Sequence, residues 1–346
     1  MDEEPANSEG ADEGRANSVA GGAKKLRAES RINSDLLPAG MAWRTLSMSR
    51  LLKLTGYLFG GLIVLIGIAA CVIYVTSNSR MAKTYAIKPR ALAIPTDAAA
   101  LTRGRHIAET RGCNECHGKD YAGNKVIDDG AMGVLHGPNL TRGKGGRVAS
   151  FNDEDWVRAI RHGVGPDGRG LYLMPSEEYT HFSDEDLGAV VAFLKTIPAV
   201  DRDRVPISLG PVSRVLLATG KIKMTAEVID HAKRQPATMT PEITVDYGRY
   251  LANGCAGCHG GNFSGGKIEI GPPNWPHASN LTPHPEGRLT KWTEEDFIRV
   301  IRTAKRPDGT ELNPVMPSLF GQLDDVELKA LWVFFKSLPP TAIGAR

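Results

Sequence analysis

Residues 112–118 read GCNECHG, and residues 254–260 repeat the arrangement as GCAGCHG. Each stretch places two cysteines three positions apart and a histidine directly after the second cysteine. On a helix, residues three apart lie on nearly the same face, so both thiols can point at one flat molecule while the imidazole lies beside them. The spacing therefore predicts two copies of a site for a planar ligand.

A porphyrin fits this geometry, because its two vinyl groups can accept the two thiols while the histidine coordinates the iron from the same side. The CxxCH spacing is the signature of c-type haem attachment. We predict two covalently attached haem c groups, bound by Cys113, Cys116 and His117 in the first copy and by Cys255, Cys258 and His259 in the second.

Other chemistries for these cysteines fit less well. The sequence has five cysteines, and every one except Cys71 belongs to a CxxCH unit, so none remains for a disulfide framework. A Cys₄ zinc site built from both pairs would leave the two histidines unexplained. A thioredoxin-like redox motif needs a βαβ pattern, which the flanking sequence lacks.

The chain downstream of the first motif is duplicated. Residues 137–176 reappear as 278–318, and DEDLGAVVAFLKTIP at 184–198 reappears as DVELKALWVFFKSLP at 325–339. The offset stays at 141 or 142, which indicates two copies of one domain. Each copy has few large apolar residues for its length, so a bound apolar cofactor is expected to complete its core.

Helix signals dominate both copies, and strand signals are scarce. Asn152 with Asp155, and Thr293 with Asp296, form capping patterns before amphipathic helices. A second amphipathic helix ends each copy. The sequence predicts a mainly α fold, with apolar stripes formed by Leu187, Val190, Val191 and Leu194 in the first copy and by Leu328, Leu331, Trp332 and Phe335 in the second.

A six-coordinate iron needs a second axial ligand from each copy. Met174 and Met316 each lie 57 residues after their motif histidine, and each precedes Pro-Ser. This match favours a methionine ligand in both copies, although a lone methionine is more often a core residue. His136 and His277, at an offset of 141, are the alternative ligands. The unmatched histidines are interpreted as surface residues: His106, His162, His181, His231 and His284.

Residues 57–75 form an uncharged apolar run that is roughly long enough, at ~1.5 Å per residue, to cross a ~30 Å hydrocarbon core. The run exceeds a signal-peptide h-region and no A-x-A-like site follows it, which favours an uncleaved anchor. Basic residues before it outnumber those after it, which places the N-terminus in the cytoplasm. These residues are Arg15, Lys24, Lys25, Arg27, Arg31, Arg44, Arg50 and Lys53 before the run, and Arg80, Lys83, Lys88 and Arg90 after it.

These patterns divide the 346 residues into five segments. The net charge of +3 is small and the charges are interspersed, so no basic face indicates nucleic-acid binding. Residues 1–47 are poor in large apolar side chains and are expected to be disordered. The predicted segments are a disordered extension at 1–47, a transmembrane anchor at 48–78, haem domains at 79–198 and 241–346, and a linker at 199–240.

Over about residues 100–340 the chain resembles membrane-anchored dihaem cytochromes c of bacteria, with two class I cytochrome c domains. The resemblance rests on the CxxCH units, the Met-Pro loops, Gly104 or Gly248 in the first helix, and Phe193 or Phe334 in the last. It implies that the terminal helices cross, and that each motif histidine donates a hydrogen bond from its other ring N–H to a loop carbonyl oxygen. Pro138 fits this loop. The second copy has Ser279 there, so Pro272 or Pro273 is an alternative partner for His259.

The resemblance implies a carrier of single electrons between respiratory or dehydrogenase partners, with the haem domains on the periplasmic side of the bacterial inner membrane. Cytochrome subunits of membrane-bound alcohol or sugar-acid dehydrogenases look similar, so a dehydrogenase or oxidase complex is an expected partner. Whether the chain is itself an enzyme stays open. The alternatives are a dihaem peroxidase or another haem oxidoreductase with one open iron site, and a gas-sensing module.

Overall fold

The computed structural model describes residues 47–268 and 271–345. The chain divides into two units at Gly60/Gly61, and the described residues from Gly61 onward form one compact unit. The predicted disordered extension lies, except for its last residue, outside the described residues.

Helix α1 spans Met48–Ala82 and carries the predicted membrane segment. Its apolar side chains are exposed all round, as Leu58 at 65 % and Ile63 at 56 % illustrate. By length and composition the helix can cross a membrane.

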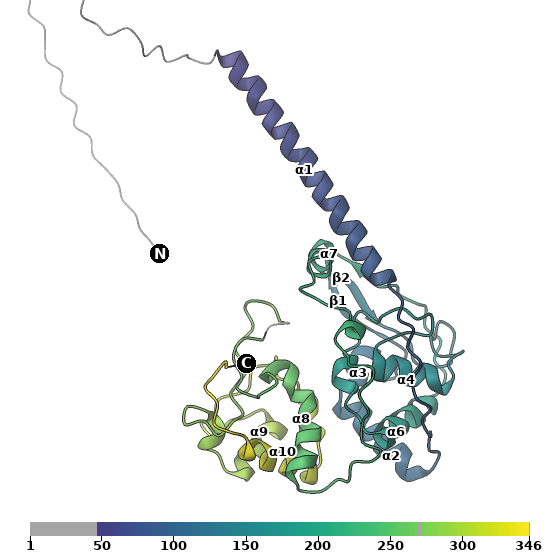
Figure 1. Cartoon of the computed structure of the whole chain (residues 1–346). Helices are drawn as coiled ribbons and strands as arrows, with labels where there is room; N and C mark the ends of the chain where they lie inside the picture. Colours follow the sequence, from purple (N-terminus) through teal and green to yellow (C-terminus); the bar gives the residue numbers. More distant parts are fainter. Residues whose placement is uncertain (1–46, 269–270, 346) are drawn as a thin grey trace, which may run out of the picture. The chain divides into compact units, whose positions relative to one another are not determined.

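The first haem domain is built on the crossing of α2 (Ala98–Thr110) and α6 (Asp184–Lys195), which Figure 1 shows beneath α4. The two backbones touch at Gly104, where an added Cβ would lie 2.0 Å from the carbonyl oxygen of Ala189. Only a residue without a side chain permits this approach. The crossing that the resemblance implied is therefore present.

The second domain repeats this crossing with α8 (Val245–His259) and α10 (Asp325–Ser337). A Cβ on Gly248 would lie 2.0 Å from the carbonyl oxygen of Ala330. The two glycines named in the sequence thus occupy equivalent points of close backbone contact.

The predicted amphipathic helices are α4 (Asp153–His162) and α9 (Glu294–Thr303). Both begin with a complete capping box, in which the Asn152 or Thr293 side chain accepts from the third-residue amide and the aspartate accepts in return. The predicted apolar stripes of α6 and α10 are buried in the two cores, with Trp332 packed at the edge of the second.

A small antiparallel sheet in the first domain was not predicted. Its strands are β1 (Asn124–Asp129), β2 (Gly133–Gly137) and β3 (Ser208–Leu209), in that order. Strand β1 has almost no buried side chain, so no alternation of apolar and polar residues marks it. The sheet is held by pairing and by packing on the haem motif, since a Cβ on Gly137 would lie 1.8 Å from the carbonyl oxygen of Cys116.

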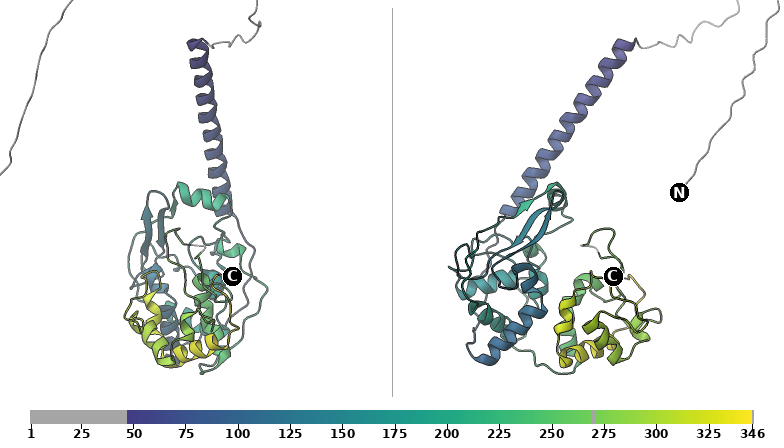
Figure 2. Two further views of the ribbon diagram at one scale, coloured as in Figure 1. Left: turned by 90° about the vertical axis from the view of Figure 1, so that its left-hand side faces the viewer. Right: turned by 180° about the vertical axis from the view of Figure 1, so that it is seen from behind.

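The segment after the first domain packs against that domain. β3 pairs with β2 in the sheet of the first domain. The helix α7 (Pro211–Ala218) and the 3₁₀ turn η1 (Thr225–Glu227) come next along the chain (Figure 2). Leu217 and Met224 are fully buried. The short elements that remain lie near the site: α3 (Cys113–His117), α5 (Ser176–Tyr179), η2 (Arg288–Thr290) and η3 (Ser318–Gln322).

Candidate functional site

Both CxxCH units are helical, but they join the preceding helix differently. In the first copy α2 ends at Thr110, and Gly112 takes a left-handed conformation (φ 74°) before α3 begins at Cys113. In the second copy the unit forms the last turns of α8 without interruption. Each unit ends at a left-handed glycine, Gly118 or Gly260, which turns the chain away directly after the histidine.

The two motif histidines are oriented alike. The Nδ1–H of His117 donates to the Pro138 carbonyl oxygen at 2.8 Å, and that of His259 donates to the Ser279 carbonyl oxygen at 2.7 Å. These bonds fix the tautomer and leave Nε2 with its lone pair for a metal. His117 is only 7 % exposed, and burial lowers its pKa, which favours the neutral ligand form.

The suggestion that Pro272 or Pro273 is the partner of His259 was wrong. Ser279 occupies the position equivalent to Pro138, and its backbone carbonyl makes the bond. The interaction needs a carbonyl at that place and not a proline, because the acceptor belongs to the main chain.

Two buried asparagines hold these carbonyl loops, and sequence reasoning missed them. Asn139 donates to the Val200 carbonyl oxygen at 2.9 Å and accepts from the Thr141 amide. Asn280 does the same with Thr341 and Thr282. The signal was present in the sequence, since both copies contain Asn-Leu-Thr directly after the acceptor residue.

In the second domain the predicted site residues line one cavity. Its empty volume is about 1160 Å³, counting the part open to solvent, and Cys255, Cys258, His259 and Met316 all border it. His277 also lines this cavity, but its side chain is exposed. The remaining lining is mostly apolar, as a porphyrin requires, and includes Leu281, Leu289, Phe297, Val300, Leu331 and Phe335. The residues therefore fit a haem.

In the first domain Cys113 and Met174 pack against the same hydrophobic core. The Met174 carbonyl oxygen accepts from the Ser176 amide at 2.9 Å and from Thr225 Oγ1 at 2.8 Å, so the loop is clamped by the segment that follows the domain. The alternative ligand His136 lies on β2. Its buried Nδ1 has no hydrogen-bond partner in the part of the chain that the structure describes.

The thiols are in surroundings that disfavour thiolates. Burial raises the pKa of Cys113 to about 12 and that of Cys255 to about 11. Redox-active cysteines are instead found where nearby positive charge lowers the thiol pKa. Within residues 47–268 and 271–345, the four motif cysteines do not form a group of metal-ligand atoms lying within 4.8 Å of one another.

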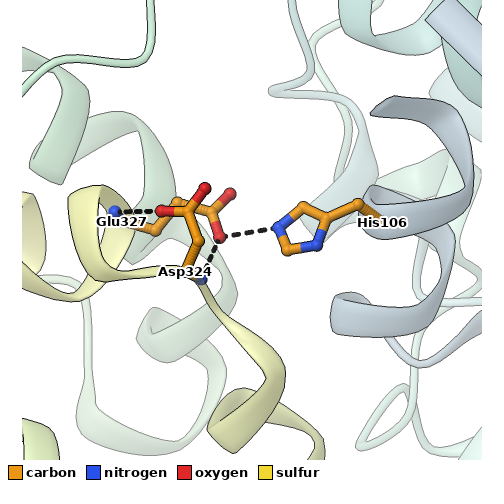
Figure 3. Close-up of side chains that lie close together, drawn as sticks. All are labelled: His106, Asp324 and Glu327. Carbon is orange, nitrogen blue, oxygen red and sulfur yellow. Dashed lines mark hydrogen bonds and ion pairs between the residues drawn. The ribbon is translucent and has the colours of Figure 1, made fainter. Parts of the chain in front are cut away.

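A buried charge network joins the two haem domains (Figure 3). His106 Nε2 donates to Glu327 Oε2 at 2.7 Å, and the same oxygen accepts from the Asp324 amide in the capping box of α10. Arg103 bonds Asp186 of its own domain and contacts Glu327 of the other. Glu327 is 2 % exposed, and these partners account for its buried charge.

The contact between the domains is approximately twofold symmetric, because equivalent residues of the two copies make equivalent contacts with the opposite domain. Asp186 and Glu327 occupy the same position of α6 and α10, 141 residues apart. Glu327 accepts from His106, and Asp186 accepts from Tyr250 at 2.6 Å. Both acids are thus bonded by the first helix of the opposite domain, which fixes how the domains meet.

The interpretation of the unmatched histidines as surface residues was wrong for His162, which is buried, and only partly right for the other four, which are half-buried. His106 lies half-buried in the domain contact. His162 is buried at the end of α4, where its Nδ1 lies 3.1 Å from His231 Nδ1. Burial, together with the charges of His231 and two arginines, lowers the pKa of His162 to about 4.

The domain contact is expected to weaken as the pH rises. The hydrogen bond to Glu327 raises the pKa of His106, against the opposing effects of burial and Arg103. A raised folded-state pKa gives stability that is present below the unfolded-state pKa and is lost as the pH rises through the folded-state value. The protection of the amides at the start of α10, measured relative to the intrinsic exchange rate at each pH, should therefore fall as the pH rises above the ordinary histidine pKa of about 6.5. The His106→Gln variant should lack this dependence, and an unchanged profile would contradict this role.

Comparisons with known proteins agree with two similar domains. Residues 99–194 match the family described as cytochrome C oxidase, cbb3-type, subunit III, and residues 245–339 match the family described as cytochrome c. The two matched regions contain the first and second CxxCH units, respectively.

Curated relatives cover much of this chain at low identity. The fructose dehydrogenase cytochrome subunit of Gluconobacter japonicus is 25 % identical over 272 residues, which are 72 % of this chain and 55 % of that protein. The cytochrome c subunit of alcohol dehydrogenase (quinone) from Gluconobacter oxydans is 25 % identical, covering 72 % of this chain and 56 % of that protein. The chain thus spans about half the length of these relatives. A diheme cytochrome c-type protein of Cereibacter sphaeroides is 25 % identical, covering 69 % of this chain and 86 % of that protein.

Proposed function

We propose that the chain carries single electrons at a membrane and that histidine and methionine hold each iron. The premise is that the chain is a dihaem cytochrome c, with two cytochrome c domains and two haem c groups. When bound, each haem supplies a reversible one-electron couple. The protein's own residues would hold and shield the group: the motif cysteines would tether it, the hydrogen-bonded histidine would supply Nε2 as a ligand, and the apolar cavity would exclude water.

The observation that carries this proposal is the matched pair of ligand loops. Met316 lines the cavity that also contains His259 and both cysteines. Met174 stands at the equivalent spacing and packs on the core that Cys113 touches. If His117 with Met174 and His259 with Met316 each held an iron, no ligand position would remain for a substrate, which favours electron transfer over peroxidase chemistry. Carbon monoxide tests the choice, because the reduced protein should resist it at both haems, and ready binding at one haem would favour an open catalytic or sensing site.

We expect the Met316→Ala variant to lower the reduction potential of one haem only. A methionine that held the iron together with histidine would raise the reduction potential, so its loss should shift one of two redox waves downward by roughly 0.1 V or more, within the ~0.8 V range that haem ligands cover. Redox titration with absorption spectra measures both waves. Met239→Leu is the matched control, since Met239 packs on the same core without lining the cavity. Two unshifted waves would favour His277 as the ligand.

The partner is proposed to be a membrane-bound dehydrogenase or another respiratory complex. Relatives named as cytochrome subunits of fructose, alcohol and gluconate dehydrogenases support this class. The apolar helix α1 and the basic residues before its apolar run favour a single pass through the bacterial inner membrane, with the haem domains on the periplasmic side. The proposed domain boundaries are 79–198 and 241–346, with a linker at 199–240. Affinity purification from native membranes tests this partner: a co-purifying dehydrogenase that reduces both haems on substrate addition is expected, and a chain isolated alone would argue against it.

A further inference from the structure

Helix α7 is fixed to the last turns of α1. The Arg214 guanidinium lies over the Tyr74 ring, 4.4 Å from its centroid, and its Nη1 donates to Ser77 Oγ and Asn78 Oδ1, each at 2.9 Å. In the other direction, Arg80 Nη1 donates to the Leu217 carbonyl oxygen at 2.7 Å. Figure 2 shows α7 beside this end of α1. The two helices are therefore held at one level along the axis of α1.

That level corresponds to the edge of the membrane. The uncharged apolar run of α1 ends at Val75, and polar residues follow from Thr76 onward. Aromatic residues such as Tyr74 are enriched where the hydrocarbon core meets the headgroups. An element bonded to Tyr74 and to the next turn must therefore lie at the headgroup level whenever α1 spans a bilayer.

The outward face of α7 is apolar. Val212 and Val215, three positions apart, are 42 % and 40 % exposed, whereas Ser213 and Leu217 on the other face are buried. Exposed lysines follow at the end of the helix, at Lys221 and Lys223. An apolar face bordered by basic residues is the pattern of a helix that lies in the plane of a membrane interface and contacts anionic lipids.

We propose that α7 is a lipid-contacting helix, which inserts Val212 and Val215 at the boundary between headgroups and acyl chains and holds the first haem domain against the bilayer. The inference rests on the proposed anchoring by α1. The bilayer is the occupant because the contacts with Tyr74, Ser77 and Asn78 place these valines at its surface.

Further contacts connect the end of α1 to the proposed haem site of the first domain. Arg80 forms an ion pair with Glu227 at 2.7 Å, and Glu227 ends the 3₁₀ turn that begins at Thr225. Thr225 Oγ1 donates to the Met174 carbonyl oxygen. The segment that contacts lipid thus also supports the loop of the proposed first ligand, so the first haem domain is held to the membrane as a unit.

Spin labels on the full-length holoprotein in nanodiscs with anionic lipids test this proposal. In a Cys71→Ser background, nitroxides are attached to Val215→Cys and, as a control, to Ile243→Cys, which is 50 % exposed at the start of the second domain. Collision rates with oxygen, which partitions into lipid, and with a water-soluble nickel chelate are compared. The label at 215 should favour oxygen over nickel several-fold relative to the label at 243. Equal ratios at both positions would overturn the proposal.

A third label separates this inference from the anchoring on which it rests. Ile66→Cys lies in the middle of the apolar run. If its label is shielded from nickel while the label at 215 is not, the anchor stands and the α7 proposal fails. If the label at 66 is itself exposed to nickel, both fail. The haem absorption spectrum confirms that each variant is folded, and Val212→Cys should repeat the result at 215.

Discussion

The Cys255→Ala/Cys258→Ala variant is expected to lose half of the covalently bound haem and the order of its second domain. Both thiols border the cavity of about 1160 Å³, and the haem that they tether completes the core. Without it, the mostly apolar lining of a cavity that is partly open to solvent would be left in contact with water, which destabilises the domain by the free energy of the lost apolar burial. Haem content by pyridine haemochrome and hydrogen exchange across residues 245–339 measure the two effects.

Matched variants make this result specific. The Cys71→Ala variant should retain both haems, because Cys71 lies on the exposed surface of α1. The Cys113→Ala/Cys116→Ala variant should lose the other haem and disorder the first domain instead. Two haems still attached in either double variant would contradict the assignment of these thiols.

The Gly248→Ala variant is expected to destabilise the second domain, although alanine is the better helix former. Helix propensity alone would make this change stabilising by about 1 kcal/mol. The new Cβ would lie 2.0 Å from the Ala330 carbonyl oxygen and 2.6 Å from Phe334 Cβ, so α8 and α10 must move apart. We expect a net loss of about 2 kcal/mol or more, which lowers the melting temperature by roughly 10 °C for a domain of this size.

A glycine in open space serves as the control. No atom lies within 4 Å of a Cβ built on Gly261, which is in the same domain, so the Gly261→Ala variant should change stability by less than about 0.5 kcal/mol. Equal melting temperatures for the two variants would show that the helix crossing tolerates a methyl group, against the geometry described.

The helices and the haem motifs were predictable because their signals are local. The capping boxes at Asn152 and Thr293 and the stripe containing Leu187 are read over a few residues, and the structure places them as expected. The sheet was not predictable, because β1 exposes most of its side chains and is stabilised by partners elsewhere in the chain.

The contact between the domains could not be predicted from the sequence for a related reason. His106 and Glu327 are separated by 221 positions, and no local sequence pattern near either residue indicates that they are in contact. One clue was available: an acid recurs at Asp186 and Glu327, three residues after each helix cap, and in both copies it is buried. A buried acid requires a partner, so the duplication itself pointed to a charged contact.

The most direct test of the central claim is the mass of the denatured, full-length protein from a host that matures c-type cytochromes. We expect a mass equal to the polypeptide plus two haems, with both haems retained on a denaturing gel and each one absent only when its own cysteine pair is removed. A chain that carries no haem after denaturation would contradict it.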